Sequence, residues 1–248
     1  MRSVHALFSA VFLSCIPFTA VHAAQSPQWG YSGDGNSEHW GNLDPSFSIC
    51  AAGQNQSPID IHHAVHTQHA PLSIKTGAGP YKITHDGHTI DVLPAGAPTE
   101  LVLDGEVYTL KQFHFHNPSE FTFNGKHYPL EAHFMFMHEH QRLVVSVAYD
   151  TGKPSAGVEA FTHQLTNIPH QETLMEQPFD IKSLLPSTLR YYRFSGSLTF
   201  PPCSEGVIWL VLKHPVPMSA AQLATIKQAI GQSNSRPTQP LNGRVILD

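Results

Sequence analysis

Short runs in which apolar and polar side chains alternate fill most of the chain after its first two dozen positions. Alternation with a period of two is typical of strands that bury one face. Turn residues separate the runs. Asp86-Gly87 predicts a hairpin with a type I′ turn, and Asn124-Gly125 predicts that the chain turns between the strands at 106–116 and 128–137. The predicted strands cover residues 81–84, 88–92, 106–116, 128–137, 142–149 and 207–213.

Helical periodicity is convincing in two places, residues 155–165 and 219–230, and Ser219 is a candidate N-cap for the second. A loop-rich segment covers 29–58, and no linker, repeat or low-complexity tract divides the chain beyond it. The length of 248 residues suits one large domain. We therefore predict a mainly β (α+β) protein, a single domain around a large twisted, mostly antiparallel sheet with a few short peripheral helices.

The first 23 residues have the pattern of a secretory signal peptide. Arg2 provides the positive end, an apolar stretch follows at 6–21, and Val21-His22-Ala23 offers small residues for cleavage. A membrane anchor is the alternative, but Pro17 interrupts a stretch already short for a span. A lipoprotein signal ending at Cys15 fits the preceding residues poorly. We predict a signal peptide at 1–23, a mature domain at 24–248, and export to a periplasm or secretion.

Removal of that segment leaves two cysteines, Cys50 and Cys203. An even pair in an exported chain favours a disulfide, and two buried free thiols are the alternative. A bridge would close a loop of about 150 residues and contribute about 4–5 kcal/mol in the chain-entropy model.

Charge narrows the range of partners. Only 13% of the residues are charged, the net charge is −5, and Lys and Arg form no cluster. Binding of nucleic acid or of an anionic membrane through a basic face is therefore not expected. Histidine is unusually abundant, with 18 residues against 14 for Lys and Arg together.

Three of these histidines form a candidate metal site. His114 and His116 alternate within one predicted strand and share a face with Gln112, while His133 lies in the next histidine-bearing strand. Three imidazoles that leave a fourth position open for water are typical of a catalytic zinc site. Gln112 and Glu131 each precede a histidine by two residues, so each can accept the second ring N–H of its neighbour. His116 needs an acceptor from elsewhere.

Further motifs extend this pattern along the chain. They are QNQSPID at 54–60, QFHFH at 112–116, Ser119-Glu120, LEAH at 130–133, GSLTFPP at 196–202, CSEG at 203–206 and RPTQPLN at 236–242. In this order, and from residue 29 onward, the chain closely resembles the α-class carbonic anhydrases, in particular the branch that bacteria export. In that branch a disulfide matches Cys50 and Cys203.

The resemblance implies a chemistry. Zn²⁺ on His114, His116 and His133 would generate hydroxide, which attacks CO₂ reversibly to give bicarbonate and a proton, and sulfonamides or anions would inhibit at the open position. Thr199 matches a gatekeeper whose hydroxyl donates to Glu120. His88 matches the residue that exports the proton.

The resemblance also assigns the wall of the CO₂ pocket and identifies departures from the family. The matching wall residues are Met135, Val145, Leu198, Phe200 and Trp209. Phe200 stands where a small polar residue is usual, and Phe121 and Phe194 stand where a histidine and a tyrosine are common. Because those two polar groups belong to a network near the residue that matches Glu131, we expect activity at a reduced level. Because the Phe200 side chain is bulky, we also expect altered inhibitor fit.

Two other functions remain open. In a cupin-type oxygenase, Glu120 would join the histidines as an iron ligand, although the second cupin motif lacks its glycine. A carbonic-anhydrase-like zinc-binding protein with weak catalysis is the other alternative. The sequence leaves the oligomeric state open, with a dimer among the options.

Overall fold

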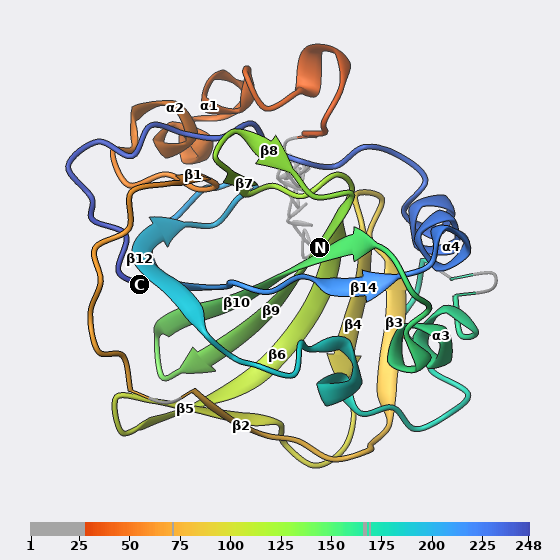
Figure 1. Ribbon diagram of the computed structural model, residues 1–248. Helices are drawn as coiled ribbons and strands as arrows, with labels where there is room; N and C mark the ends of the chain where they lie inside the picture. The colour runs from red at the N-terminus through yellow and green to blue at the C-terminus, as the bar shows by residue number, and fades with distance from the viewer. Residues whose placement is uncertain (1–27, 71, 166–167, 169) are drawn as a thin grey trace, which may run out of the picture.

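The computed structural model describes residues 28–70, 72–165, 168 and 170–248, so the predicted signal peptide and Cys15 lie outside the described residues. Eleven strands form one twisted sheet with the order β11-β3-β4-β6-β9-β10-β13-β12, to which β2, β5 and β14 attach (Figure 1). The strands of this sheet are β2 (Ser73–Lys75), β3 (Tyr81–His85), β4 (Ile90–Pro94), β5 (Glu100–Leu103), β6 (Glu106–His116), β9 (Leu130–His138), β10 (Gln141–Thr151), β11 (Thr173–Leu174), β12 (Tyr191–Ser197), β13 (Glu205–Leu212) and β14 (Val216–Met218).

All six predicted runs are strands, with ends within two residues of the prediction. Most pairs are antiparallel, as expected, but β10 pairs in parallel with both β13 and β14. A smaller sheet contains β1 (Asp60–Ile61), β7 (Thr122–Phe123) and β8 (Lys126–His127).

Both predicted helices are present and lie side by side (Figure 1). They are α3 (Ala156–Thr162) and α4 (Ala220–Ile230). Ser219 caps α4 in a capping box with Gln222, which confirms the predicted helix start. The remaining short helices are α1 (Trp40–Leu43), α2 (Ile49–Ala52) and the 3₁₀ turns Gly33–Gly35, Pro45–Phe47 and Ile181–Leu184. No helix within the described ranges is long and apolar enough to cross a membrane.

One of the two predicted turns has a different type from the one expected. Asn124 and Gly125 both have positive φ, 51° and 76°, as a type I′ turn requires, and they join β7 to β8. The hairpin predicted at Asp86-Gly87 is confirmed, because β3 and β4 pair antiparallel. Its predicted type I′ turn is wrong, because a four-residue loop, 86–89, joins the strands, and Gly87 has positive φ while Asp86 does not. The Asp86 carboxylate accepts the backbone N–H groups of His88 and Thr89 and closes that loop.

The sheet separates two apolar clusters. Because side chains alternate along a strand, neighbouring residues belong to different clusters. The larger cluster includes Phe113, Phe115 and Val145, whereas Val144 and Trp209 belong to the smaller one on the opposite face. His114 and His116 alternate with Phe113 and Phe115 and therefore lie on the face of the smaller cluster.

Candidate active site

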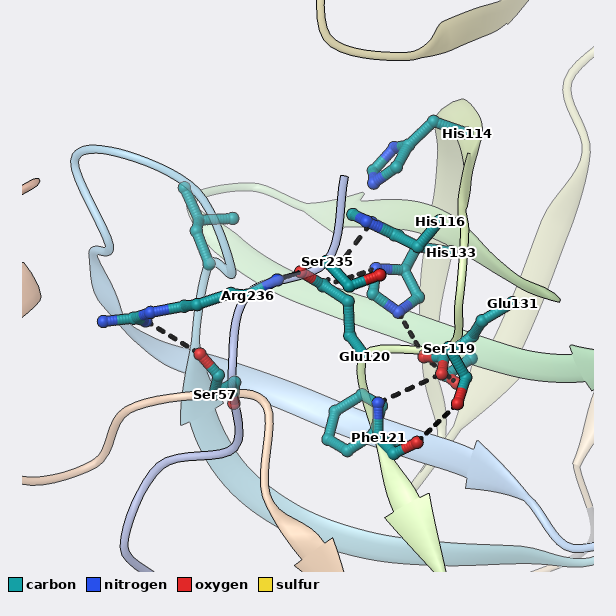
Figure 2. Close-up of polar contacts among 12 residues, drawn as sticks. Ser57, His114, His116, Ser119, Glu120, Phe121, Glu131, His133, Ser235 and Arg236 are labelled. Atoms are coloured by element: carbon teal, nitrogen blue, oxygen red, sulfur yellow. Dashed lines mark hydrogen bonds and ion pairs between the residues drawn. The ribbon is translucent and has the colours of Figure 1, made fainter. Parts of the chain in front are cut away.

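Strands β6 and β9 bring the three histidines together. They pair antiparallel with His114 opposite His133, so both side chains project from the same face of the sheet. All three imidazoles are buried, with 3% or less of each residue exposed. One ring nitrogen of each lies within 4.8 Å of the other two, and the rings converge in Figure 2.

A separate acceptor orients each ring. His114 Nδ1–H donates to Gln112 Oε1 at 2.9 Å, and His133 Nε2–H donates to Glu131 Oε1 at 2.5 Å. These are the two hydrogen bonds predicted from the spacing along the strands. His116 Nδ1–H donates to the backbone carbonyl of Asn234 at 2.8 Å. That acceptor is 118 positions away in the chain, and nothing in the local sequence indicates it.

The opposite nitrogens point into the space between the rings. Nε2 of His114 and of His116 are buried and have no hydrogen-bond partner. Burial lowers the pKa of His114 well below its ordinary value, and it lowers the pKa of His116 and of His133 to about 3. The imidazoles are therefore neutral at physiological pH, with lone pairs free to bind a metal. Three neutral imidazole nitrogens are a donor set that suits Zn²⁺.

Glu120 lies beside this cluster and is fully buried. Its Oε2 atom is 3.5 Å from His116 Nε2, and its Oε1 atom accepts the backbone N–H of Arg236 at 2.8 Å. Burial raises the pKa of Glu120 well above its ordinary value, while hydrogen bonds from the Thr199 hydroxyl and from Arg236 act in the opposite direction. The effect of Thr199 on this pKa is in the direction that the predicted Thr199–Glu120 pairing requires, and the pairing itself stays a prediction.

Arg236 was not anticipated from the sequence. Its guanidinium is almost fully buried and donates to Gln56 Oε1 and to the carbonyls of Ser57 and Cys50. Its backbone N–H donates to Glu120, and Figure 2 shows Arg236 between Ser57 and Glu120. It therefore ties three distant segments together behind the site.

The predicted disulfide is present and anchors the loop that contains Thr199 and Phe200. Cys50 and Cys203 are joined with a Cα–Cα distance of 5.0 Å, and the Cys203 N–H donates to the Phe200 carbonyl at 2.9 Å. The bridge thus links α2 to the turn that follows Thr199 and Phe200.

A small apolar pocket opens between the histidines and this loop. Its lining includes four of the five predicted wall residues, and the prediction of Val145 is wrong. Val145 faces the larger core on the other side of the sheet, and its neighbour Val144 lines the pocket instead. Ser146 lies opposite His133 in the β9–β10 pairing, so even-numbered residues of β10 face the site. The pocket residues are His114, His133, Met135, Val144, Leu198, Thr199, Phe200 and Trp209.

A larger cavity of about 140 Å³ leads from His114 and His116 past His88. The His88 ring stacks on Trp29 with centroids 3.8 Å apart and planes 10° apart. Burial lowers the pKa of His88, an effect that Asp86 opposes and His85 reinforces. Trp29 lies in the loop-rich segment, and nothing in the sequence indicates that it contacts His88.

The two unusual phenylalanines lie in one aromatic cluster. Phe121 packs against Trp209 at 4.8 Å and against Phe194 at 5.7 Å between ring centroids. Glu131 instead accepts the hydroxyl of Ser146 at 2.8 Å, and burial raises the pKa of Glu131 to about 7. Ser146 was not anticipated either, because its position opposite His133 depends on strand register.

Comparison with known proteins agrees with this geometry. The family model described as eukaryotic-type carbonic anhydrase matches residues 35–248. A carbonic anhydrase of Pectobacterium carotovorum is 45% identical over 226 residues, covering 91% of this chain and 92% of that protein. The solved α-carbonic anhydrase of Thermovibrio ammonificans, in complex with the inhibitor sulfanilamide, has a TM-score of 0.85 and 44% identity over 90% of this chain and 100% of that one. The chain belongs to the α-carbonic anhydrases, lyases that interconvert carbon dioxide and bicarbonate.

Proposed function

We propose that this carbonic anhydrase hydrates CO₂ at a Zn²⁺ ion held by His114, His116 and His133. The observation that carries the proposal is the convergence of three buried, neutral imidazoles, two of them with an unpartnered Nε2, beside an apolar pocket. Zinc bound there would act as a Lewis acid that lowers the pKa of a coordinated water to about 7, a value for which carbonic anhydrases are the reference case.

Thr199 and Glu120 would orient the reacting oxygen. A carboxylate can only accept hydrogen bonds, so Glu120 fixes the direction of the Thr199 hydroxyl proton. The Thr199 oxygen would then be left to accept a hydrogen bond from the attacking hydroxide, which would aim a lone pair of the attacking oxygen at carbon. Arg236 would support this arrangement by donating its backbone N–H to Glu120.

Replacing Thr199 with valine tests this role, because valine keeps the shape of the side chain and removes the hydroxyl. We expect kcat/KM for CO₂ to fall about 100-fold, the lower end of the range for loss of one oriented hydrogen bond at a reacting centre. Thr199→Ser retains the hydroxyl and should keep most of the activity. Equal rates for the valine and serine variants would remove Thr199 from the mechanism.

The apolar pocket would hold the substrate. Met135, Val144, Leu198 and Trp209 offer no charged group, so a small nonpolar molecule can replace water there at little cost. Phe200 lies between this pocket and the wider cavity and lines both. We propose that sulfonamides and small anions reach the open metal position through the wider cavity, and that the Phe200 ring limits their size.

His88 would carry the product proton to solvent through the wider cavity. Only a neutral imidazole can accept a proton, and the lowered pKa of His88 keeps it neutral down to a lower pH than an exposed histidine. As the pH is lowered, protonation of His88 should reduce kcat, and this fall is therefore expected at a pH below the ordinary pKa of histidine.

The variant His88→Ala should lower kcat at least about tenfold, because a general acid–base group is lost. We expect kcat/KM for CO₂ to stay close to the wild-type value, since the proton leaves after bicarbonate has formed. Stopped-flow measurements in dilute and in concentrated imidazole buffer would check this, and concentrated buffer should restore kcat. A fall in kcat/KM of the same size would assign His88 a role in the chemical step instead.

The cupin-type alternative is wrong. The chain belongs to a different family, and the cluster of potential metal ligands in the described residues contains the three histidines without Glu120. A zinc-binding protein with weak catalysis is distinguished from an efficient enzyme by stopped-flow CO₂ hydration with zinc-loaded protein. Rates no higher than the uncatalysed reaction, with one bound zinc per chain, would favour the binding protein.

We also propose export to the periplasm. The pattern at 1–23 and the disulfide between Cys50 and Cys203 support it, since disulfides persist in oxidising compartments. Intact mass of the protein recovered from a periplasmic fraction would test both cleavage after residue 23 and the location.

A further inference from the structure

Ser146 occupies a special position on β10. It is directly opposite His133 in the β9–β10 pairing, and only 1% of it is exposed. A hydroxyl at such depth needs a hydrogen-bond partner, either within the protein or from an ordered water. Its partner is Glu131, the residue that orients the His133 ring.

The Glu131 carboxylate is held from several directions. Its Oε1 atom accepts both His133 Nε2–H at 2.5 Å and Ser146 Oγ–H at 2.8 Å. Its Oε2 atom accepts the backbone N–H of Phe121 at 3.1 Å. In the described part of the chain, Ser146 is the one side chain besides His133 that hydrogen-bonds to this carboxylate.

Aromatic side chains pack around the His133 ring that Glu131 orients. Phe121 lies 6.0 Å from the His133 ring, and Trp209 lies 4.9 Å from it, centroid to centroid. Phe194 packs behind Phe121. The side chains of Phe121 and Phe194 fill space near His133, but they carry no group that can donate a hydrogen bond to Glu131. The hydroxyl of Ser146 therefore supplies a side-chain donor that Phe121 and Phe194 lack.

We propose that Ser146 is a positioning residue for the metal centre. Its hydroxyl fixes Glu131 Oε1, which keeps the proton of His133 on Nε2 and leaves the Nδ1 lone pair directed toward His114 and His116. Without that hydroxyl, Glu131 keeps its backbone contact through Oε2 but has more freedom at Oε1, so the His133 ring is less firmly oriented. This inference rests on the proposed zinc site.

Zinc affinity of the folded protein is the direct test. Partners one step beyond the metal ligands typically change metal affinity by 10–100-fold, and Ser146 acts through Glu131, so we expect Ser146→Ala to weaken zinc binding about tenfold. Competition with a chromophoric chelator measures the dissociation constant, and trapping of released zinc measures the dissociation rate, which should rise in proportion. Neither readout requires activity.

Two matched variants separate the hydroxyl from packing. Ser146→Thr keeps the hydroxyl and should bind zinc within about twofold of wild type. Val145→Ala truncates the adjacent residue of the same strand, which faces the other core. It should lower the midpoint of urea unfolding, because buried apolar side-chain volume is removed, and leave the zinc affinity unchanged.

The outcomes separate the two proposals. If wild-type protein fails to bind zinc tightly, the proposed metal centre is wrong, whatever Ser146 does. If wild type binds zinc and Ser146→Ala binds it equally well, the metal centre stands and the role of Ser146 is overturned. An affinity loss in Ser146→Thr equal to that in Ser146→Ala would also overturn it, because the hydroxyl would then be irrelevant.

Discussion

The variant His114→Ala is expected to lose zinc binding and at least about a thousandfold in CO₂ hydration, while the protein stays folded. Two imidazoles cannot complete the three-ligand site that a catalytic zinc requires, and a thousandfold corresponds to about 4 kcal/mol of lost transition-state stabilisation. The fold should persist because the hydrogen bond of His114 goes to the Gln112 side chain rather than to the backbone of a neighbouring element.

Metal content by mass spectrometry and stopped-flow hydration would measure both effects, with circular dichroism as the check on folding. His140→Ala is the matched control, since His140 is exposed in the turn between β9 and β10. The control should keep full zinc content and activity. A folded His114→Ala protein with wild-type zinc content would contradict the assignment of this ligand.

Removal of the disulfide should have the largest effect on stability. The double variant Cys50→Ser/Cys203→Ser opens a loop with a sequence separation of 153 residues. In the chain-entropy model, we expect the free energy of unfolding to fall by about 5 kcal/mol. Activity should fall as well, because Cys203 ties to α2 the turn that directly follows Thr199 and Phe200.

Urea unfolding under oxidising and reducing conditions would measure this effect. Reduced wild-type protein should match the double variant, and Ser204→Ala, a substitution in the same turn, should remain close to oxidised wild type. Unfolding midpoints that do not respond to reductant would show that the bridge contributes nothing to stability.

Part of the site could be predicted from the pattern of residues that are two or three positions apart in the sequence. His114 and His116 share a face because strand side chains alternate, and Gln112 and Glu131 reach His114 and His133 because residues two apart on a strand are neighbours. Such relationships depend on local geometry alone. The same is true of the Ser219 capping box, whose contacts span three residues.

Relationships across strands could not be predicted in this way. Whether Val144 or Val145 faces the pocket depends on the register of β10 against β9, and a shift of one residue exchanges the two. The two Asx-Gly turns show the same limit, since Asn124-Gly125 adopts positive φ at both residues while Asp86 is held in a wider loop by its own side chain.

By itself the sequence determined six of the strands, the N-cap of α4, the histidine face and, through its motifs, the family. Only the tertiary structure decided which distant groups complete the site: the Asn234 carbonyl on His116, the Arg236 backbone on Glu120, Trp29 against His88 and Ser146 on Glu131. The physical reason is that side-chain periodicity is a local property of the backbone, whereas these contacts depend on how the chain returns to the same place after tens of residues.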